Sequence, residues 1–222
     1  MFDFLSGFCQ TEEKLNKENV MKKILLLDAD GVVIVPREKY FSDRYSEEFG
    51  VSKDVMMPFF KKEFNDCVRG TRSIQEVFAE QNMLEKWGWK GSLEELFQYW
   101  WAGENTRFEE VLALVQELRK EGVKCYLTTD QEKNRGEYMW HGMGLDQDLD
   151  GAFFSYQLGV RKTDALYWEK VLTELGSPNP ADVEFWDDEQ ENVTAAKEAG
   201  IDAHFFTNFE DFKQSVQAVW KD

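Results

Sequence analysis

The second half of the chain alternates between short apolar runs and amphipathic segments, and this alternation constrains the fold more than any other feature of the sequence. Apolar runs of strand length lie at 123–129, 152–155, 183–186 and 203–206. Segments with helical spacing lie at about 106–122, 132–142, 165–175, 192–200 and at the C-terminus, around Phe212, Val216 and Val219. Strands that alternate with helices form parallel sheets with helices on both faces. We therefore predict an α/β fold with a doubly wound parallel sheet.

The first half begins with one more strand and then changes character. Residues 22–35 predict a hydrophobic strand with a sharp turn, whereas 36–105 shows helical spacing and little strand signal. Ligands of parallel sheets bind at the carboxyl ends of the strands. A helical block inserted after the first strand is therefore placed to cover that end. We divide the chain into an α/β core (22–35 and 106–222), a helical cap (36–105) and an N-terminal extension (1–21).

Three local patterns indicate how helices of this chain begin and pack. Ser73 with Glu76, and Ser92 with Glu95, have the spacing of capping boxes that open helices. Thr106 and Glu109 are predicted to cap the next helix in the same way. The aromatic run at 96–101 favours a place in the core over a platform for a ligand.

The net charge of −17 disfavours several classes of partner. It opposes binding to nucleic acid or to an anionic membrane surface. No apolar run approaches the roughly 20 residues of a membrane-spanning helix, and the first residues lack the regions of a signal peptide. We expect a cytoplasmic monomer or homodimer that acts on a small molecule. A phosphate-binding pocket in such a chain would need local cations or a metal ion.

The cysteines and histidines of this chain do not indicate a metal site, a disulfide framework or a His-based catalytic triad. Cys9, Cys67 and Cys125 show neither metal-ligand spacing nor a disulfide framework, which is typical of a reducing compartment. The two histidines, His141 and His204, disfavour His-based triads and zinc sites, and we assign them structural roles.

Reactive residue types follow four of the expected strands. They are Asp28 and Asp30, Thr128 and Thr129, Arg161 and Lys162, and Asp187 and Asp188. Because parallel strands end at one edge of a sheet, these side chains are expected to converge there. Four carboxylates at one mouth repel one another unless a cation is present, and Mg²⁺ accepts carboxylates together with water and substrate phosphate. One aspartate can then be a metal-bound nucleophile while its neighbour serves as acid and base.

Taken singly, these signals also have ordinary structural interpretations. Most Asp-x-Asp-Gly strings are only turns, and Thr129 or Lys162 alone is typical of a surface or a helix cap. The acidic string at 187–192 is typical of a solvated helix start. Arg69, Arg72 and Arg107 favour solvated or salt-bridging roles, although Arg69 is kept as a candidate substrate-binding residue.

Together, the four motifs resemble those of the haloacid dehalogenase superfamily, and specifically its Mg²⁺-dependent phosphatases with a small helical (C1-type) cap. The matching strings are LLLDADGVV, YLTTD, GVRKTDALYWEKVL and VEFWDDEQENVTAAKEAGI. They occur in the family's order, and the helical insert lies where the family has its cap. The resemblance covers 22–35 and 106–206.

This resemblance implies a role for each motif residue. Asp28 is the nucleophile that forms an aspartyl-phosphate, and Asp30 is the general acid and base. Thr129 binds a phosphoryl oxygen, and Lys162 offsets negative charge on the nucleophile and the phosphate. The implied Mg²⁺ ligands are Asp28, the backbone carbonyl of Asp30, Asp188 directly, and Asp187 as helper.

Two positions depart from the family pattern. Asp130 stands where Asn is usual, and Thr163 replaces a proline after Lys162. A carboxylate aimed at the phosphate would weaken binding, so we expect Asp130 to turn toward a backbone amide or toward Lys133 or Arg135. Its backbone N–H then remains available to the substrate.

The implied function is a phosphatase that hydrolyses a small phosphorylated metabolite. Alternatives are a phosphomutase, a dehalogenase, or a catalytically silent binding or regulatory domain of the same fold. A dehalogenase is disfavoured, because its reaction needs neither a metal nor a leaving-group acid. This chain has residues for both, Asp30 as the acid and the 187–188 pair for the metal. A receiver-type signalling domain is disfavoured by the order of its acidic residues and by the long insert.

Overall fold

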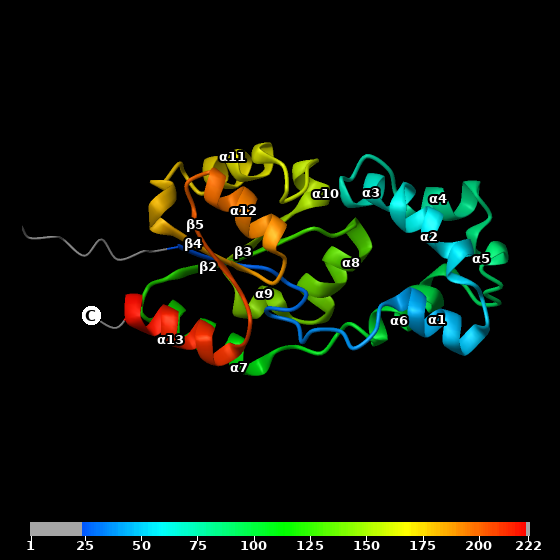
Figure 1. Cartoon of the computed structure of the whole chain (residues 1–222), viewed down its shortest axis with the longest axis horizontal. Coiled ribbons are helices and arrows are strands. Elements are labelled where there is room, and N and C mark those ends of the chain that lie inside the picture. Colours follow the sequence, from blue (N-terminus) through cyan, green and yellow to red (C-terminus); the bar gives the residue numbers. More distant parts are fainter. Residues whose placement is uncertain (1–23, 221–222) are drawn as a thin grey trace, which may run out of the picture.

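The computed structural model describes residues 24–220, so the expected extension at 1–21 lies outside the described residues. A parallel five-stranded sheet forms the centre (Figure 1). Its strands are β1 (Ile24–Leu27), β2 (Lys124–Thr129), β3 (Gly151–Phe154), β4 (Val183–Asp187) and β5 (Asp202–Phe205). They are arranged in the order β3-β2-β1-β4-β5. The predicted α/β fold with a doubly wound parallel sheet is confirmed.

The central strand, β1, is apolar because both of its faces are covered. Leu25, Leu26 and Leu27 have no exposed surface, as expected for a strand of a parallel sheet with helices on both sides. β1 pairs with β2 on one side and with β4 on the other. The residues that follow these three strands therefore come to one edge of the sheet.

Helices cover both faces of the sheet (Figure 1). One face packs against α7 (Glu109–Lys120), α9 (Leu145–Asp148) and α13 (Phe209–Trp220), the other against α10 (Ser155–Leu158), α11 (Ala165–Glu174) and α12 (Gln190–Glu198). Further elements are α8 (Lys133–Glu137), the π-helix η1 (Tyr138–Gly142) and the 3₁₀-helix η2 (Pro180–Asp182). Phe212 and Val216 of α13 are fully buried, so the predicted apolar face of this helix does enter the core.

The start of α7 differs from the prediction. Its N-cap residue is Phe108, which makes no side-chain capping bond. The carbonyl of Thr106 instead accepts a hydrogen bond from the Val35 N–H, and the Phe108 N–H donates to the carbonyl of Val33. The predicted capping by Thr106 and Glu109 is wrong, because Thr106 belongs to a linker that pairs antiparallel with the chain leaving β1.

Between the two linkers, the described chain forms a helical insert. Its helices are α1 (Phe41–Phe49), α2 (Lys53–Lys61), α3 (Glu63–Val68), α4 (Ile74–Glu80), α5 (Met83–Lys86) and α6 (Leu93–Ala102). They pack around a hydrophobic cluster of their own, with Tyr45, Phe59 and Trp87 among its largest buried side chains. The insert therefore has a hydrophobic core separate from those of the sheet.

Two sequence predictions for the insert are confirmed. Capping boxes are present at Ser73 with Glu76 and at Ser92 with Glu95. The aromatic run of α6 contributes Phe97 and Trp100 to the buried cluster, in agreement with a core role. No helix within residues 24–220 is long and apolar enough to cross a membrane.

The insert meets the core on two sides. The Ser155 hydroxyl of α10 donates to the carbonyl of Val68 in α3 at 2.7 Å. On the other side, Trp101 of α6 stacks on Tyr138 of η1, with ring centroids 4.8 Å apart. The division of the chain at residues 36 and 105 stays a prediction.

Candidate active site

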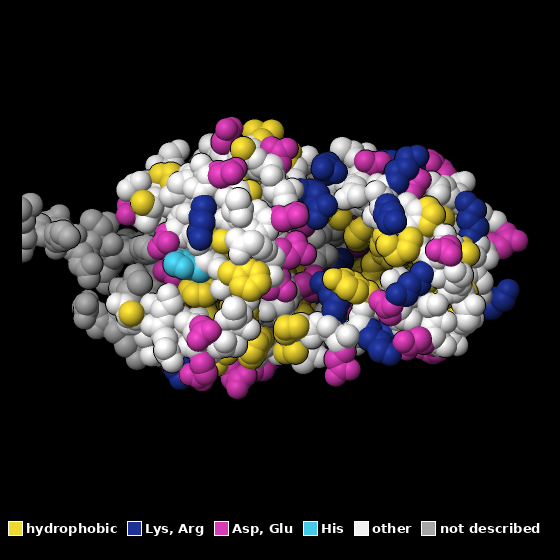
Figure 2. Space-filling model, viewed as in Figure 1, with side chains coloured by type: hydrophobic (Ala, Val, Ile, Leu, Met, Phe, Trp, Pro, Cys, Tyr) yellow, Lys and Arg dark blue, Asp and Glu magenta, His cyan; other side chains and the backbone are white. Residues whose placement is uncertain are grey.

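The carboxyl ends of β1, β2 and β4 open into a cavity of about 700 Å³ between the sheet and the helical insert. The space-filling view is hollowed between these two parts of the molecule (Figure 2). Residues from all four predicted motifs line the cavity: Asp28, Asp30, Thr129, Lys162 and Asp188. The structure thus brings the predicted strand ends together at one mouth.

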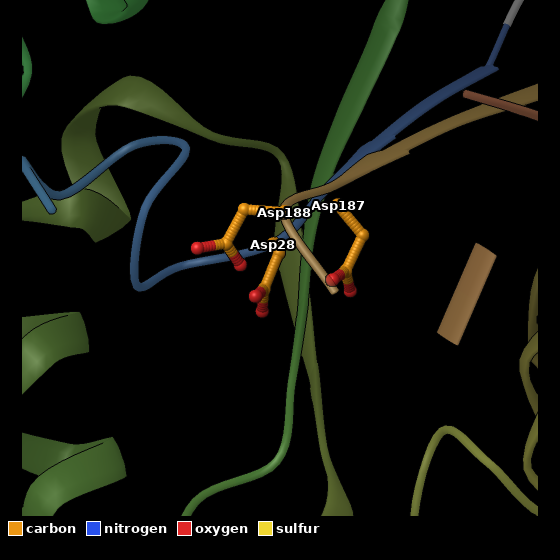
Figure 3. A group of neighbouring side chains, drawn as sticks. All are labelled: Asp28, Asp187 and Asp188. Atoms are coloured by element: carbon orange, nitrogen blue, oxygen red, sulfur yellow. The ribbon is translucent and has the colours of Figure 1, made fainter. Parts of the chain in front are cut away.

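Three carboxylates meet where β1 and β4 end. Leu27 pairs in register with Trp186, so Asp28 and Asp187, the residues that follow them, are neighbours. Asp28, Asp187 and Asp188 each place an oxygen within 4.8 Å of the others. Figure 3 shows the three side chains leaving the two adjacent strand ends.

Lys162 lies buried against two of these carboxylates. Its Nζ is 2.6 Å from Asp28 Oδ1 and 2.6 Å from Asp187 Oδ2. Burial lowers the pKa of Lys162, but the charges of Asp187 and Asp28 outweigh this effect, and the pKa lies well above its usual value. The ammonium group therefore stays charged and offsets one of the three negative charges.

The remaining negative charge is electrostatically unfavourable. Burial raises the pKa of Asp28 well above its usual value, and the charge of Asp187 raises it further. The pKa of Asp188 is raised to about 6, mainly by burial and secondly by the negative charge of Asp187. A divalent cation would favour the ionised forms, and an all-oxygen donor set is what Mg²⁺ binds in proteins. The residues present therefore fit the predicted metal.

Hydrogen bonds fix the carboxylate of Asp187, and a glycine makes room for the carboxylate of Asp188. Asp187 Oδ1 accepts a hydrogen bond from the Glu189 N–H at 2.7 Å, and the Asn192 side-chain amide donates to both oxygens of Asp187 at 3.2 and 3.1 Å. Gly31 faces Asp188 with a φ of +87°, and a Cβ added at Gly31 would overlap with the Asp188 carboxylate. Only glycine permits this approach, because L-residues avoid this conformation.

Asp30 is surrounded by hydrogen-bond donors. Gln131 Nε2 donates to Asp30 Oδ2 at 2.7 Å. Nη2 of Arg37 and Nη2 of Arg135 each lie 3.7 Å from an Asp30 oxygen. Glu104 shares these arginines, since its carboxylate lies 3.9 Å from Arg37 and its backbone carbonyl accepts from Arg135. The Asp30 carboxylate is therefore oriented at the cavity by groups from both the core and the insert.

Thr129 and Asp130 end β2 in different environments. Thr129 is buried and lines the cavity. The Asp130 carboxylate accepts from the Lys162 backbone N–H at 3.0 Å and pairs with Arg161 Nε at 2.9 Å. Arg161 Nη1 also donates to Asn65 Oδ1 of α3 at 3.0 Å. The structure thus turns Asp130 toward a backbone amide, as predicted.

The predicted basic partners of Asp130 are wrong. Lys133 pairs with Glu137, one helical turn further along α8. Arg135 faces Asp30 instead. The true partner is Arg161, because the loop between α10 and α11 returns to the end of β2 and carries both Arg161 and the Lys162 amide there.

The structure does not bring Arg69 to the site. It ends α3, is exposed, and is not among the described residues that line the cavity. Arg72 pairs with Glu80, and Arg107 pairs with Asp148 at 2.7 Å, so the salt-bridging interpretation of these two arginines is confirmed. Among the described residues, the arginines that line the cavity are Arg37, Arg135 of α8, and Arg161.

The cavity-lining residues that sequence reasoning missed include Arg37, Glu104, Gln131 and Asn192. Two of these carried a local signal, since Gln131 directly continues the second motif and Asn192 lies within the fourth, in the first turn of α12. Arg37 and Glu104 lie just inside the two ends of the insert. Only their position next to the linkers pointed to the mouth of the site.

A family model described as haloacid dehalogenase-like hydrolase matches residues 22–200, most of the chain. The chain belongs to the haloacid dehalogenase-like hydrolase family. The resemblance inferred from the four motifs is thereby confirmed. This hydrolase carries an acidic cluster where β1 and β4 end.

Two similar proteins are named as phosphatases. Enolase-phosphatase E1 of Aquifex aeolicus is 24% identical over 213 residues, which cover 82% of this chain and 88% of the relative. A sesquiterpene phosphatase of Aspergillus oryzae is 33% identical over 96 residues, or 40% of this chain and 45% of the relative, so that the match spans less than half of either protein.

Solved structures share the fold of this hydrolase. A family enzyme of Bacteroides thetaiotaomicron, solved in complex with magnesium and inorganic phosphate, has a TM-score of 0.72 at 18% identity and covers 87% of this chain and 98% of its own. A HAD-like family hydrolase of Porphyromonas gingivalis has a TM-score of 0.76 at 19% identity. The match covers 91% of this chain and 99% of the neighbour.

Proposed function

We propose that this hydrolase is a phosphatase that releases inorganic phosphate from a small phosphorylated metabolite. The observation that carries the proposal is the pair Asp28 and Asp30 at one cavity, with a buried lysine and a further carboxylate beside it. The phosphatase names of two relatives and the magnesium and phosphate bound by a structural neighbour support it.

In the first step, a carboxylate oxygen of Asp28 attacks phosphorus. A bond forms between Asp28 and phosphorus, and the ester bond from phosphorus to the leaving oxygen breaks. Asp30 donates its proton to that oxygen, so the product leaves as a neutral alcohol. A carboxylate nucleophile divides one difficult displacement into two easier steps.

In the second step, Asp30 takes a proton from water while the water oxygen attacks phosphorus. The bond between Asp28 and phosphorus breaks, and phosphate is released. Thr129 is proposed to hydrogen-bond a phosphoryl oxygen, and the Lys162 ammonium, 2.6 Å from Asp28, to balance negative charge during both steps. Fixed charges of this kind act strongly in a site that excludes water.

The proposed Mg²⁺ ligands are Asp28, the backbone carbonyl of Asp30 and Asp188, with Asp187 holding Lys162 beside them. When bound, the ion would neutralise part of the charge on the nucleophile and the phosphate. The helical insert is proposed to act as a cap that closes over the substrate and excludes water.

The test is hydrolysis of 4-nitrophenyl phosphate by the full chain with Mg²⁺. We expect turnover that chelation abolishes, and an Asp188→Ala variant that behaves as the chelated wild type does. Asp28→Asn should lose turnover while its urea unfolding midpoint shows a folded protein, since the shape is kept and only the charge is lost. Activity that survives exhaustive chelation would contradict the metal assignment.

A further inference from the structure

The helical insert lines its part of the cavity with aromatic rings. Phe60, Phe64 and Trp100, here called the aromatic wall, all line the cavity. Their ring centroids are 5.7 Å (Phe60 to Phe64), 5.4 Å (Phe60 to Trp100) and 5.6 Å (Phe64 to Trp100) apart. Each ring therefore contacts both of the others, and Met57 of α2 lines the cavity beside them.

Buried rings of the insert pack against the aromatic wall. The ring of Phe60 lies 6.0 Å from the buried Trp87 and 6.2 Å from Phe41, which is buried in the cluster and also lines the cavity. Phe64 lies 5.6 Å from the buried Phe59. Phe60 and Phe64 are themselves only half-buried. The wall is thus a preformed apolar surface facing the cavity, of the kind that binds apolar parts of ligands.

The lysine and arginine side chains that line the cavity are paired with carboxylates of the protein. Six lysines and arginines line it among the described residues, against nine aspartates and glutamates. Each of the six has a carboxylate partner: Arg37 and Arg135 with Asp30, Lys39 with Glu47, Lys53 with Asp43, Arg161 with Asp130, and Lys162 with Asp28 and Asp187. A second anionic group on a substrate would therefore meet net negative charge.

The wall also offers little to a polyhydroxylated group. Aromatic carbon surface supplies no hydrogen-bond partner, and a hydroxyl that loses water without gaining one is disfavoured. An apolar group of the same size gains free energy in proportion to the surface that it removes from water.

We infer that the substrate is the phosphate monoester of an uncharged, apolar alcohol that bears a ring or a hydrocarbon chain. This inference rests on the proposed phosphatase function. The phosphate lies at the Asp28 end of the cavity, and the apolar group lies against the aromatic wall.

The experiment compares kcat/KM of the full chain with Mg²⁺ for four primary alkyl phosphates. These are 2-phenylethyl phosphate, glucose 6-phosphate, 3-phosphoglycerate and ethyl phosphate, whose alcohols are apolar, polyhydroxylated, anionic and minimal. We expect 2-phenylethyl phosphate to exceed the other three by about tenfold or more, the scale that apolar pockets achieve. Equal or better hydrolysis of glucose 6-phosphate or 3-phosphoglycerate would overturn the inference and leave the phosphatase proposal standing. Hydrolysis of 4-nitrophenyl phosphate but of none of the four would overturn the inference alone, and hydrolysis of none of the five would overturn both.

A matched pair of variants locates the effect. Phe64→Ser should lower kcat/KM for 2-phenylethyl phosphate by a larger factor than kcat/KM for ethyl phosphate, because ethyl phosphate has less apolar surface to place against the wall. Phe49→Ser removes an exposed aromatic ring of the same insert that does not line the cavity, and it should change neither value. A Phe64→Ser variant that hydrolyses both substrates as the wild type does would contradict binding at the wall.

Discussion

At the scale of single residues, Asp30 differs from Asp28 in its partners. Gln131 donates to Asp30, and two arginines lie at 3.7 Å, whereas the buried Lys162 ammonium contacts Asp28. These partners orient the Asp30 carboxylate, but neither arginine forms an ion pair with it as short as the one between Lys162 and Asp28. The proposed acid role of Asp30 rests on this orientation at the cavity.

If Asp30 is the acid, its loss should depend on the leaving group. Asp30→Asn should slow hydrolysis of an alkyl phosphate by about 10²–10⁴-fold. Hydrolysis of 4-nitrophenyl phosphate should be slowed much less, because 4-nitrophenolate leaves without a proton. The comparison uses kcat/KM on both substrates, because this ratio reports formation of the aspartyl-phosphate and not the later step in which Asp30 is proposed to act as base. Equal losses on the two esters would count against Asp30 as the acid.

Asp130 is the residue at which this chain departs from its family's second motif. Its carboxylate pairs with Arg161, whose side chain is 34% exposed, so the ion pair is worth at most about 1 kcal/mol. Asp130→Asn keeps an oxygen for the Lys162 N–H, and we expect kcat within about fivefold of wild type. The result to watch for is an inert wild type with an active Asp130→Asn variant, which would identify Asp130 as the residue that silences the site.

At the scale of elements, α3 approaches α10 closely, just after α3 ends. Gly70 has a φ of +67°, and a Cβ there would overlap with the carbonyl of Tyr156. Gly70→Ala should therefore push α3 away from α10 and strain Gly70 itself by about 1–2 kcal/mol. We expect a higher KM together with a lower urea unfolding midpoint.

Gly50 provides the control for this prediction. It ends α1 with a φ of +69°, but a Cβ there would meet no described atom within 4 Å. Gly50→Ala should lower stability by a similar strain and leave KM unchanged. If both variants change KM alike, the effect comes from a loosened insert and not from the contact between α3 and α10.

At the scale of the whole molecule, two linkers join the insert to the core. They pair with each other through the hydrogen bonds from Val35 to Thr106 and from Phe108 to Val33. Rotation of the insert as a body would bend the chain next to this paired segment, near Pro36 and Asn105. The separate hydrophobic clusters of the insert and the core allow such a movement without unpacking either.

If the insert closes over substrate, trapping the site should change exchange at these linkers. With Mg²⁺ and beryllium fluoride as a phosphate mimic, hydrogen exchange near Pro36 and Asn105 should slow, because closure buries the linkers. Mass spectrometry with and without the mimic measures this, and Mg²⁺ alone is the control. Unchanged protection at both linkers would indicate a fixed lid.

The sheet, the helical insert and the meeting of the four motifs could be predicted from the sequence. These features follow from periodic patterns that each segment carries locally, and a parallel sheet places the ends of its strands at one edge whatever their side chains are. Asp28, Thr129, Lys162 and Asp188 could therefore be assigned to one mouth from their positions after strands alone.

Which polar groups meet across that mouth depends on the tertiary packing and could not be predicted from the sequence. Gln131 reaches Asp30 across 101 positions of the chain, and Arg161 reaches Asn65 across 96. Long side chains have many rotamers, and their partners depend on how loops return to the sheet, which no local pattern encodes. For this reason Arg161 was missed as the partner of Asp130, and Arg69, a candidate substrate-binding residue, lies outside the described lining of the cavity. The predicted cap of α7 was wrong for a related reason. Thr106 pairs with Val35, which lies on the other side of the insert in the sequence, and α7 begins only after Phe108.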